Sequence, residues 1–277
     1  MTRPIVFCTD YGTADEFVGV CHGVIARIAP AVRVIDLTHA IPRQDVFRGA
    51  LVLGRAATFM PANAVFVAVV DPGVGSERRS IAVRAGAGAL LVGPDNGLLS
   101  LAWGALGGAA VAHEITDPEL SIQPVSRTFH GRDIYAPAAA HLAAGVALES
   151  VGPAVDVADL RVVELPEPML APGVIGARVM GVDGFGNVQL NVTAQHLGDA
   201  GIAGRFSIGE HEAPFVGIFA DLPEGALGAI VDSQGYLALV VNKGSAAELL
   251  GLHEGSSVVL ESGDEGPSGP PRLQSVE

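Results

Sequence analysis

The sequence predicts an α/β protein with an amino-terminal Rossmann-like α/β domain, whose sheet is mostly parallel, and a smaller carboxy-terminal all-β barrel domain. Apolar, β-branched runs alternate with helical segments in the first half of the chain. After the proline-rich stretch LPEPMLAPG, the pattern changes to short apolar runs separated by glycine turns. We therefore predict domains over 1–164 and 174–262, a linker over 165–173, and a disordered tail over 263–277, which is rich in Gly, Pro, Ser and acidic residues.

The composition indicates a large aliphatic core. Of 277 residues, 49% are hydrophobic, 17% are charged and 5% are aromatic. The net charge of −14 argues against nucleic acid as a partner, because that contact needs clustered Lys and Arg. We see neither a signal peptide nor a membrane-length apolar span, so we expect a soluble, cytoplasmic protein without a membrane partner. The cysteines, Cys8 and Cys21, are expected to be buried free thiols.

The amino-terminal elements follow from periodicity and from turn residues. Strands are predicted over 5–9, 32–37 and 65–71, with helices over 16–28 and 44–60 between them, which implies right-handed crossovers and a parallel sheet. A strand pair over 80–83 and 89–92 and helices over 98–106 and 134–144 follow. In the carboxy-terminal domain we predict strands over 174–182, 188–192, 216–219, 228–231, 236–241 and 257–260, and a single helix over 245–250.

The candidate site follows from the ends of the strands. Asp10, Asp36 and Asp71 stand at or near the ends of three predicted strands, and parallel strands bring their carboxyl ends to one edge, where ligands bind. Arg78 lies one short loop beyond Asp71, and His130 precedes an alanine-rich helix. Such a set suits either a metal ion or a water oriented against an electrophile. Strand-capping acids and a structural histidine are the plainer alternative.

A family resemblance narrows these alternatives. The segments that carry it are TDYG at 9–12, IDLTHAIP at 35–42, VVDPGVGSERR at 69–79, GPDNG at 93–97, FHGRDIYAPAAAHLA at 129–143, DGFGN at 183–187 and NKGSAAELLG at 242–251. Together they resemble the S-adenosyl-L-methionine (SAM) hydrolases (adenosine-forming), also called SAM hydroxide adenosyltransferases, which are related to the fluorinase and the chlorinase. The segments cover nearly the whole chain except the tail.

The resemblance implies a reaction and its catalytic residues. In that family, an activated water or hydroxide attacks C5′ of the ribose and converts SAM to adenosine and L-methionine. The sulfonium is already a good leaving group, so the protein has to orient the water and lower the cost of forming hydroxide. The family's Asp-Arg-His set falls on Asp71, Arg78 and His130. Whether Asp71 or His130 accepts the proton stays open at this point.

The resemblance also implies how the substrate binds. Asp10 matches the ribose-binding aspartate, Asp183 the contact for the methionine ammonium, and Asn187 the residue that reads adenine. Ser233 resembles a contact for the methionine carboxylate, and the loop from Asn242 to Ser245 lies on the adenine side. SAM is the substrate, and neither a cofactor nor a metal is expected.

The family forms homotrimers whose sites lie between the amino-terminal domain of one subunit and the carboxy-terminal domain of its neighbour. Three alternatives stay open: a halide-using enzyme of the same family, a metal-dependent hydrolase with Asp10, Asp71 and His130 as ligands, and a non-catalytic SAM-binding protein. The Asp-Arg-His set favours water over halide, since the halide-using relatives lack it.

Overall fold

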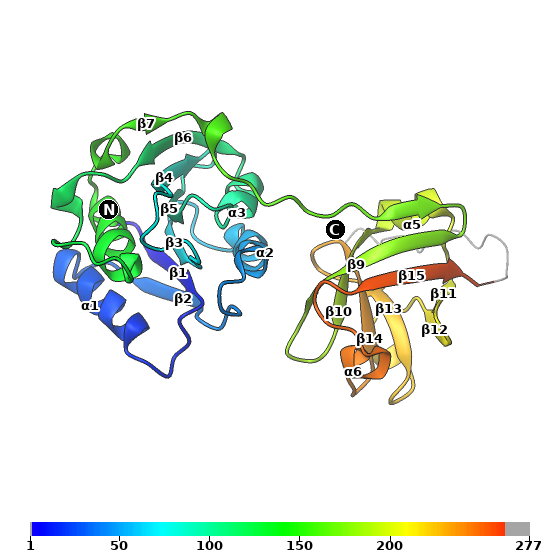
Figure 1. Ribbon diagram of the computed structural model, residues 1–277. Coiled ribbons are helices and arrows are strands. Elements are labelled where there is room, and N and C mark those ends of the chain that lie inside the picture. Colours follow the sequence, from blue (N-terminus) through cyan, green and yellow to red (C-terminus); the bar gives the residue numbers. More distant parts are fainter. Residues whose placement is uncertain (1, 264–277) are drawn as a thin grey trace. The chain divides into compact units, whose positions relative to one another are not determined.

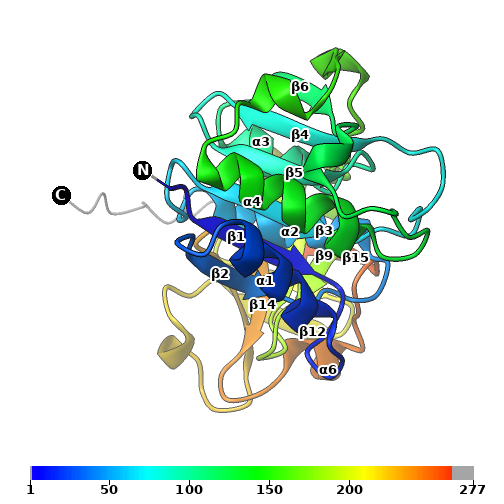
Figure 2. The same ribbon diagram turned by 90° about the vertical axis from the view of Figure 1, so that its left-hand side faces the viewer.

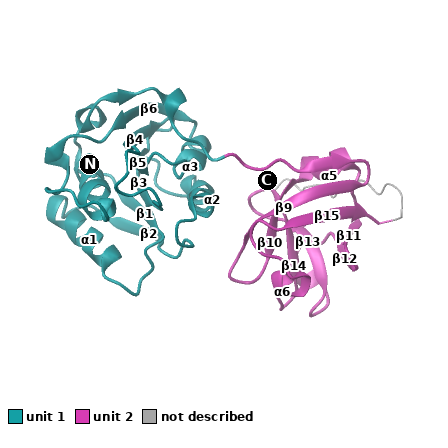
Figure 3. Ribbon diagram, viewed as in Figure 1, with its two compact units in different colours: residues 1–163 teal, residues 164–277 magenta. Residues whose placement is uncertain are grey.

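The computed structural model describes residues 2–263, which fall into two compact units with a boundary between Val163 and Glu164 (Figure 3). The segment 165–173, predicted as a linker, contains strand β8 (Met169–Ala171), which pairs with β9 (Val174–Val182). Except for Gly263, the tail predicted over 263–277 lies outside the described residues. No helix within 2–263 is long and apolar enough to cross a membrane.

The first unit is built on a seven-stranded sheet with the order β2-β1-β3-β5-β4-β6-β7 (Figure 1). The strands β2, β1, β3 and β5 are parallel, whereas β4, β6 and β7 pair antiparallel. The carboxyl ends of β1 and β3 are therefore neighbours at one edge of the sheet. The strand bounds are β1 Ile5–Thr9, β2 Val34–Thr38, β3 Val65–Val69, β4 Ser80–Ala85, β5 Leu90–Pro94, β6 Ala109–Glu114 and β7 Ala154–Val155.

Helices cover both faces of this sheet. Figure 2 shows α1 (Phe17–Ile28) and α4 (Ala136–Ala144) in front of it, and α2 (Val46–Ala57) and α3 (Ser100–Ala105) pack on the opposite face. Alternate residues of each strand point to opposite faces, so every second residue of β1 packs with α1 and α4 and the others pack with α2. Short 3₁₀ helices occupy Pro118–Leu120, Leu148–Val151 and Val157–Asp159, and a π-helical turn occupies Gly131–Tyr135.

The second unit confirms the predicted barrel. Its antiparallel strands run in the order β12-β11-β15-β9-β10-β14-β13, and a bridge between Phe215 and Ala229 joins the two ends into a nearly closed barrel. One apolar cluster fills the interior. The bounds not yet given are β10 Val188–Thr193, β11 Arg205–Ile208, β12 His211–Pro214, β13 Leu227–Val231, β14 Tyr236–Val241, β15 Ser257–Ser262, α5 Ala194–Ala200, α6 Ala246–Leu250 and the 3₁₀ helix Phe219–Asp221.

Several predicted elements were wrong or missing. The strand predicted over 216–219 is a turn, in which Asp221 accepts hydrogen bonds from the amides of Gly217 and Ile218. The strands β11 and β12 and the helix α5 were not predicted, so 245–250 is not the single helix of this unit. In the first unit, β6 was missed because AAVAHE is rich in alanine, which has low strand propensity. Cys8 and Cys21 are free and buried, as predicted.

Candidate active site

Asp71 and Arg78 form a bidentate ion pair just beyond the carboxyl end of β3. The Arg78 Nε–H donates to Asp71 Oδ1 at 2.7 Å, and Nη2 donates to Asp71 Oδ2. The side chains are only 5% exposed for Asp71 and 11% for Arg78. A paired guanidinium and carboxylate of this geometry are strongly oriented, because two parallel hydrogen bonds fix both planes.

The remaining donors of Arg78 reach three further groups. Nη2 also donates to His130 Nδ1 at 2.9 Å, and Nη1 donates to Ser80 Oγ at 3.2 Å and to the Arg79 carbonyl oxygen at 3.4 Å. A guanidinium has five N–H donors, so each donor of Arg78 has an acceptor. The structure thus brings the predicted catalytic residues Asp71, Arg78 and His130 into one hydrogen-bonded group, with Arg78 at its centre.

A tight loop places Arg78 back over Asp71. Ser76 Oγ donates to the Gly73 carbonyl at 2.7 Å and accepts from the Arg78 amide at 3.3 Å. Gly75 has a φ of +76°, and a Cβ at this position would overlap the carbonyl oxygen of Arg127. Only glycine meets both requirements, so the glycine lets the Asp71 loop pack directly on the segment that leads to His130.

His130 is held by the segment around it. It precedes the π-helical turn, in which the fully buried Asp133 accepts from Arg132 Nε at 2.6 Å and from the Ser126 amide at 2.9 Å. Burial raises the pKa of Asp133, but the hydrogen bonds from Arg132 and Ser126 outweigh burial and hold the pKa below its usual range. Asp133 is therefore an ionised anchor for the loop that carries His130.

His130 is neutral near pH 7. Burial and then the charge of Arg78 lower its pKa, while Asp71, Asp133 and a hydrogen bond with the Ser126 backbone work in the opposite direction. Since Nδ1 accepts a hydrogen bond from Arg78, the proton of the neutral ring belongs on Nε2.

Ser80 and Tyr135 pack against Arg78 and were not predicted as site residues. Ser80 Oγ lies 3.2 Å from the Tyr135 hydroxyl, and both side chains are buried. The Arg78 guanidinium carbon lies 5.7 Å from the centre of the Tyr135 ring. Ser80 directly follows the segment VVDPGVGSERR and Tyr135 lies within FHGRDIYAPAAAHLA, but the sequence predicted only a strand at the first and a helix at the second.

Asp10 lies at the end of β1, next to the strand that leads to Asp71. One of its oxygens accepts from the Gln44 amide at 2.8 Å, and Gln44 adopts a left-handed φ of +64° to make this bond. Burial raises the pKa of the Tyr11 hydroxyl, and the charges of Asp10 and Asp71 add to this rise. Asp36, expected at the same edge, instead contacts His22 and His39.

In the second unit, the predicted binding residues Asp183 and Asn187 lie together in the turn between β9 and β10. Asp183 Oδ1 accepts from the amides of Phe185 and Asn187 at 2.9 and 3.0 Å, and Oδ2 accepts from Asn187 Nδ2 at 2.8 Å. Asn187 also lines a cavity of about 520 Å³. The other residues that line it are Phe185, Phe219, Val241, Lys243 and Gly244. Phe185 is 83% exposed, so this unit presents an aromatic surface suited to a flat ring.

Ser245 and Asn242 stabilise the 242–245 loop, which lines this cavity with Lys243 and Gly244. Ser245 caps α6 by accepting from the Glu248 amide at 3.1 Å, and a Cβ on Gly186 would overlap its side chain. Asn242 Nδ2 donates to the Leu222 carbonyl at 2.7 Å. Both residues therefore hold the loop in place, whereas Ser233 is exposed in the turn between β13 and β14.

Comparison with known proteins identifies the family. The sequence model of the SAM hydroxide adenosyltransferase N-terminal domain matches residues 5–152, and that of the C-terminal domain matches residues 177–259. The chain belongs to this family.

The similarity to relatives within the SAM hydroxide adenosyltransferase family covers almost the whole chain. A protein of Salinispora arenicola named (R)-S-adenosyl-L-methionine hydrolase is 49% identical, with 94% of this chain and 98% of that protein covered. A fluorinase of Nocardia brasiliensis is 31% identical, with 94% and 98% covered. A crystal structure of an uncharacterized conserved protein from Thermotoga maritima matches with a TM-score of 0.84 at 36% identity, covering 92% of this chain and 99% of that one.

Proposed function

We propose that this protein hydrolyses SAM to adenosine and L-methionine. The observation that carries the proposal is the Asp71–Arg78–His130 group, which lies at the carboxyl edge of the parallel strands and is linked by hydrogen bonds of 2.7 and 2.9 Å. The 49% identity to an (R)-SAM hydrolase supports water as the nucleophile more strongly than the 31% identity to a fluorinase supports halide.

In the proposed step, a water oxygen forms a bond to ribose C5′ while the C5′–S bond breaks and its electron pair passes to sulfur. Methionine leaves as a neutral thioether and needs no acid, while the water has to lose a proton. Each N–H of Arg78 already has an acceptor, so Arg78 acts through its charge and by orienting its partners.

The proton acceptor is proposed to be Asp71. His130 does not suit this role, because its Nδ1 lone pair accepts a hydrogen bond from Arg78 and its Nε2 carries the ring proton. Neither nitrogen then has a lone pair in the ring plane for the proton of the water. Each oxygen of Asp71 accepts from Arg78 and keeps a second lone pair. His130 then orients the group, and bond cleavage needs no cofactor and no metal.

Substrate contacts are proposed from both units. Asp10 suits the ribose diol, since an ionised carboxylate accepts two hydrogen bonds. Asp183 and Asn187 are proposed for the methionine ammonium and adenine, with Ser233 and the loop from Asn242 to Ser245 as further contacts. A cytoplasmic location is proposed as well, because a reducing compartment suits the free thiols of Cys8 and Cys21.

The test is incubation of the protein with SAM in oxygen-18 water, with chloride and fluoride varied, followed by mass analysis. We expect labelled adenosine and unlabelled methionine in amounts that do not depend on halide. The separated sulfonium epimers should be compared, since the relative's name specifies the R form. A halogenated nucleoside, or SAM binding without adenosine formation, would rule out the hydrolase.

The proposed assembly is a homotrimer with each site shared between the first unit of one subunit and the second unit of the next. Asp71→Asn and Asn187→Ala should each be inactive alone, but co-expression should restore activity. Random mixing leaves about one site in four with both residues intact. If the co-expressed protein is no more active than the parents, or if a monomer is fully active, the site lies within one chain.

A further inference from the structure

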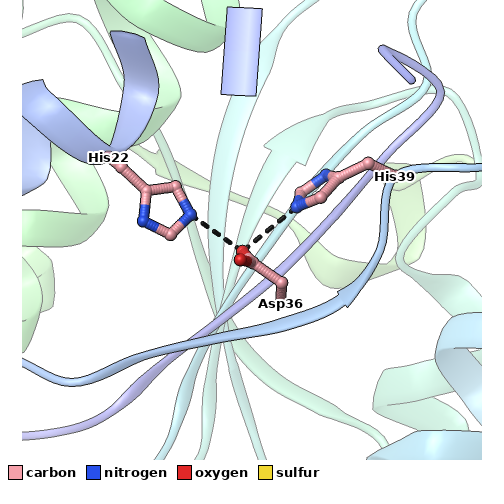
Figure 4. A group of neighbouring side chains, drawn as sticks. All are labelled: His22, Asp36 and His39. Carbon is pink, nitrogen blue, oxygen red and sulfur yellow. Dashed lines mark hydrogen bonds and ion pairs between the residues drawn. The ribbon is translucent and has the colours of Figure 1, made fainter. Parts of the chain in front are cut away.

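A second cluster of chemically reactive side chains lies on the opposite side of β1 from β3. His22 comes from α1, Asp36 from β2 and His39 from the segment after β2. Figure 4 shows the two imidazole rings on either side of the Asp36 carboxylate. Asp36 Oδ1 lies 2.8 Å from His22 Nε2 and 3.1 Å from His39 Nε2. The three ligand atoms all lie within 4.8 Å of one another.

His39 carries a buried nitrogen that lacks a hydrogen bond. Its side chain is 5% exposed, and Nε2 has no hydrogen-bond partner among residues 2–263, because its 3.1 Å approach to Asp36 lacks the alignment of a hydrogen bond. Nδ1 lies 2.8 Å from Oγ1 of the fully buried Thr9. If Nδ1–H donates to Thr9, the lone pair of Nε2 faces the carboxylate, which is unfavourable unless a cation or a proton lies between them.

We propose that this cluster binds a divalent transition-metal ion of the Zn²⁺ class through His22 Nε2, His39 Nε2 and Asp36 Oδ1, with water completing the coordination. Bonds of about 2.0–2.2 Å in a tetrahedron place neighbouring ligand atoms roughly 3.3 Å apart. The observed separations of 2.8 and 3.1 Å from Asp36 therefore need to widen by a few tenths of an ångström, and the two imidazole nitrogens, within 4.8 Å of each other, have to adopt the same spacing.

The ligand types decide which ion fits. Two imidazoles and one carboxylate favour Zn²⁺ and similar ions over Mg²⁺ and Ca²⁺, which prefer oxygen ligands. His22 is 34% exposed and Asp36 45% exposed at the side chain, so an ion and its water have access from solvent. The Thr9 hydroxyl supplies the outer hydrogen bond that a metal-binding imidazole usually makes through its other nitrogen.

A bound ion would stabilise the segment from His39 to Gln44, which hydrogen-bonds Asp10. The Gly12 amide donates to the His39 carbonyl at 2.7 Å, and the Gln44 amide donates to Asp10 Oδ2 at 2.8 Å. Metal binding at His39 would therefore tie α1 and β2 to the segment beside Asp10. This site stabilises the fold and is separate from the Asp71–Arg78–His130 group.

The experiment uses full-length protein stripped of metal with a chelator. Zn²⁺ binding is measured by calorimetry, and Co²⁺ is used as a visible-absorption probe of the ligands. We expect one ion per chain, an apparent Tm higher by about 5 °C at saturating Zn²⁺, and no comparable effect of Mg²⁺. His22→Ala and Asp36→Asn change a half-buried and an exposed side chain and should weaken binding at least about 100-fold.

His211→Ala is the matched control, since His211 is an exposed histidine on β12 of the other unit. It should bind Zn²⁺ and Co²⁺ as the unaltered protein does. The proposal is overturned if stripped protein takes up no Zn²⁺, if His22→Ala and Asp36→Asn bind it unchanged, or if His211→Ala loses as much affinity as they do. In the first case, a proton shared between His39 and Asp36 accounts for the cluster.

Discussion

Arg78→Lys is expected to lower kcat/KM for SAM hydrolysis by about 10³-fold, in a steady-state assay of adenosine formation. Lysine keeps the positive charge but has one nitrogen, which cannot hold both oxygens of Asp71 and His130 Nδ1 at once. The Asp71 carboxylate, 5% exposed, would lose its bidentate hydrogen bonds, and His130 would lose the donor that orients its ring. The loss should fall on kcat, because the group acts on the attacking water.

The adjacent residue provides a matched control. Arg79 also pairs with a buried aspartate: its Nε donates to Asp95 Oδ2 at 2.8 Å and its Nη2 lies 2.6 Å from the same oxygen. It lies outside the Asp71–Arg78–His130 group. Arg79→Lys should cost a similar amount of stability and leave kcat within about threefold, since it removes no group from the water's surroundings. If Arg78→Lys keeps more than a tenth of the activity, a positive charge alone is enough for catalysis and the bidentate hydrogen bonds to Asp71 are not needed.

The strand ends of the amino-terminal unit could be predicted because each depends on local sequence. The apolar runs before Asp10 and Asp71 are continuous, as in strands buried on both faces, and each stops at its aspartate. Asp36 misled the prediction because β2 is an edge strand, which tolerates an exposed charge within it and continues to Thr38. Local pattern alone does not distinguish an aspartate inside an edge strand from one at its end.

The parts that could not be predicted depend on contacts between distant segments. Arg78 and His130 are 52 residues apart, and no spacing rule relates them without the family resemblance. Ser80 and Tyr135 are 55 residues apart and meet only after β4 and the π-helical turn Gly131–Tyr135 come together. In the second unit, α5 begins where Thr193 caps the His196 amide, a signal that was present but was hidden by Gly198 within the helix.

Gly75→Ala is expected to reduce kcat/KM by about 10²-fold and the free energy of unfolding by about 2 kcal/mol, measured by adenosine formation and by urea denaturation. The added Cβ meets two obstacles: the left-handed φ of +76° and the backbone carbonyl oxygen of Arg127. A carbonyl in the main chain cannot rotate away as a side chain does, so the loop has to separate from the segment before His130. Because that contact sets the 2.9 Å distance between Arg78 and His130, a shift of about 1 Å there disturbs the whole group.

Gly88→Ala is the control that adds backbone strain without a steric contact like that of Gly75 with the Arg127 carbonyl. Gly88 has a φ of +94° in the turn between β4 and β5, yet nothing lies within 4 Å of a Cβ built there. This variant should lose about 1 kcal/mol of stability from backbone strain and keep its activity. If Gly75→Ala and Gly88→Ala are equally active, the contact with Arg127 does not position the catalytic group. A selective loss in Gly75→Ala means that the glycine in this loop sets the catalytic geometry through its close packing on the Arg127 backbone.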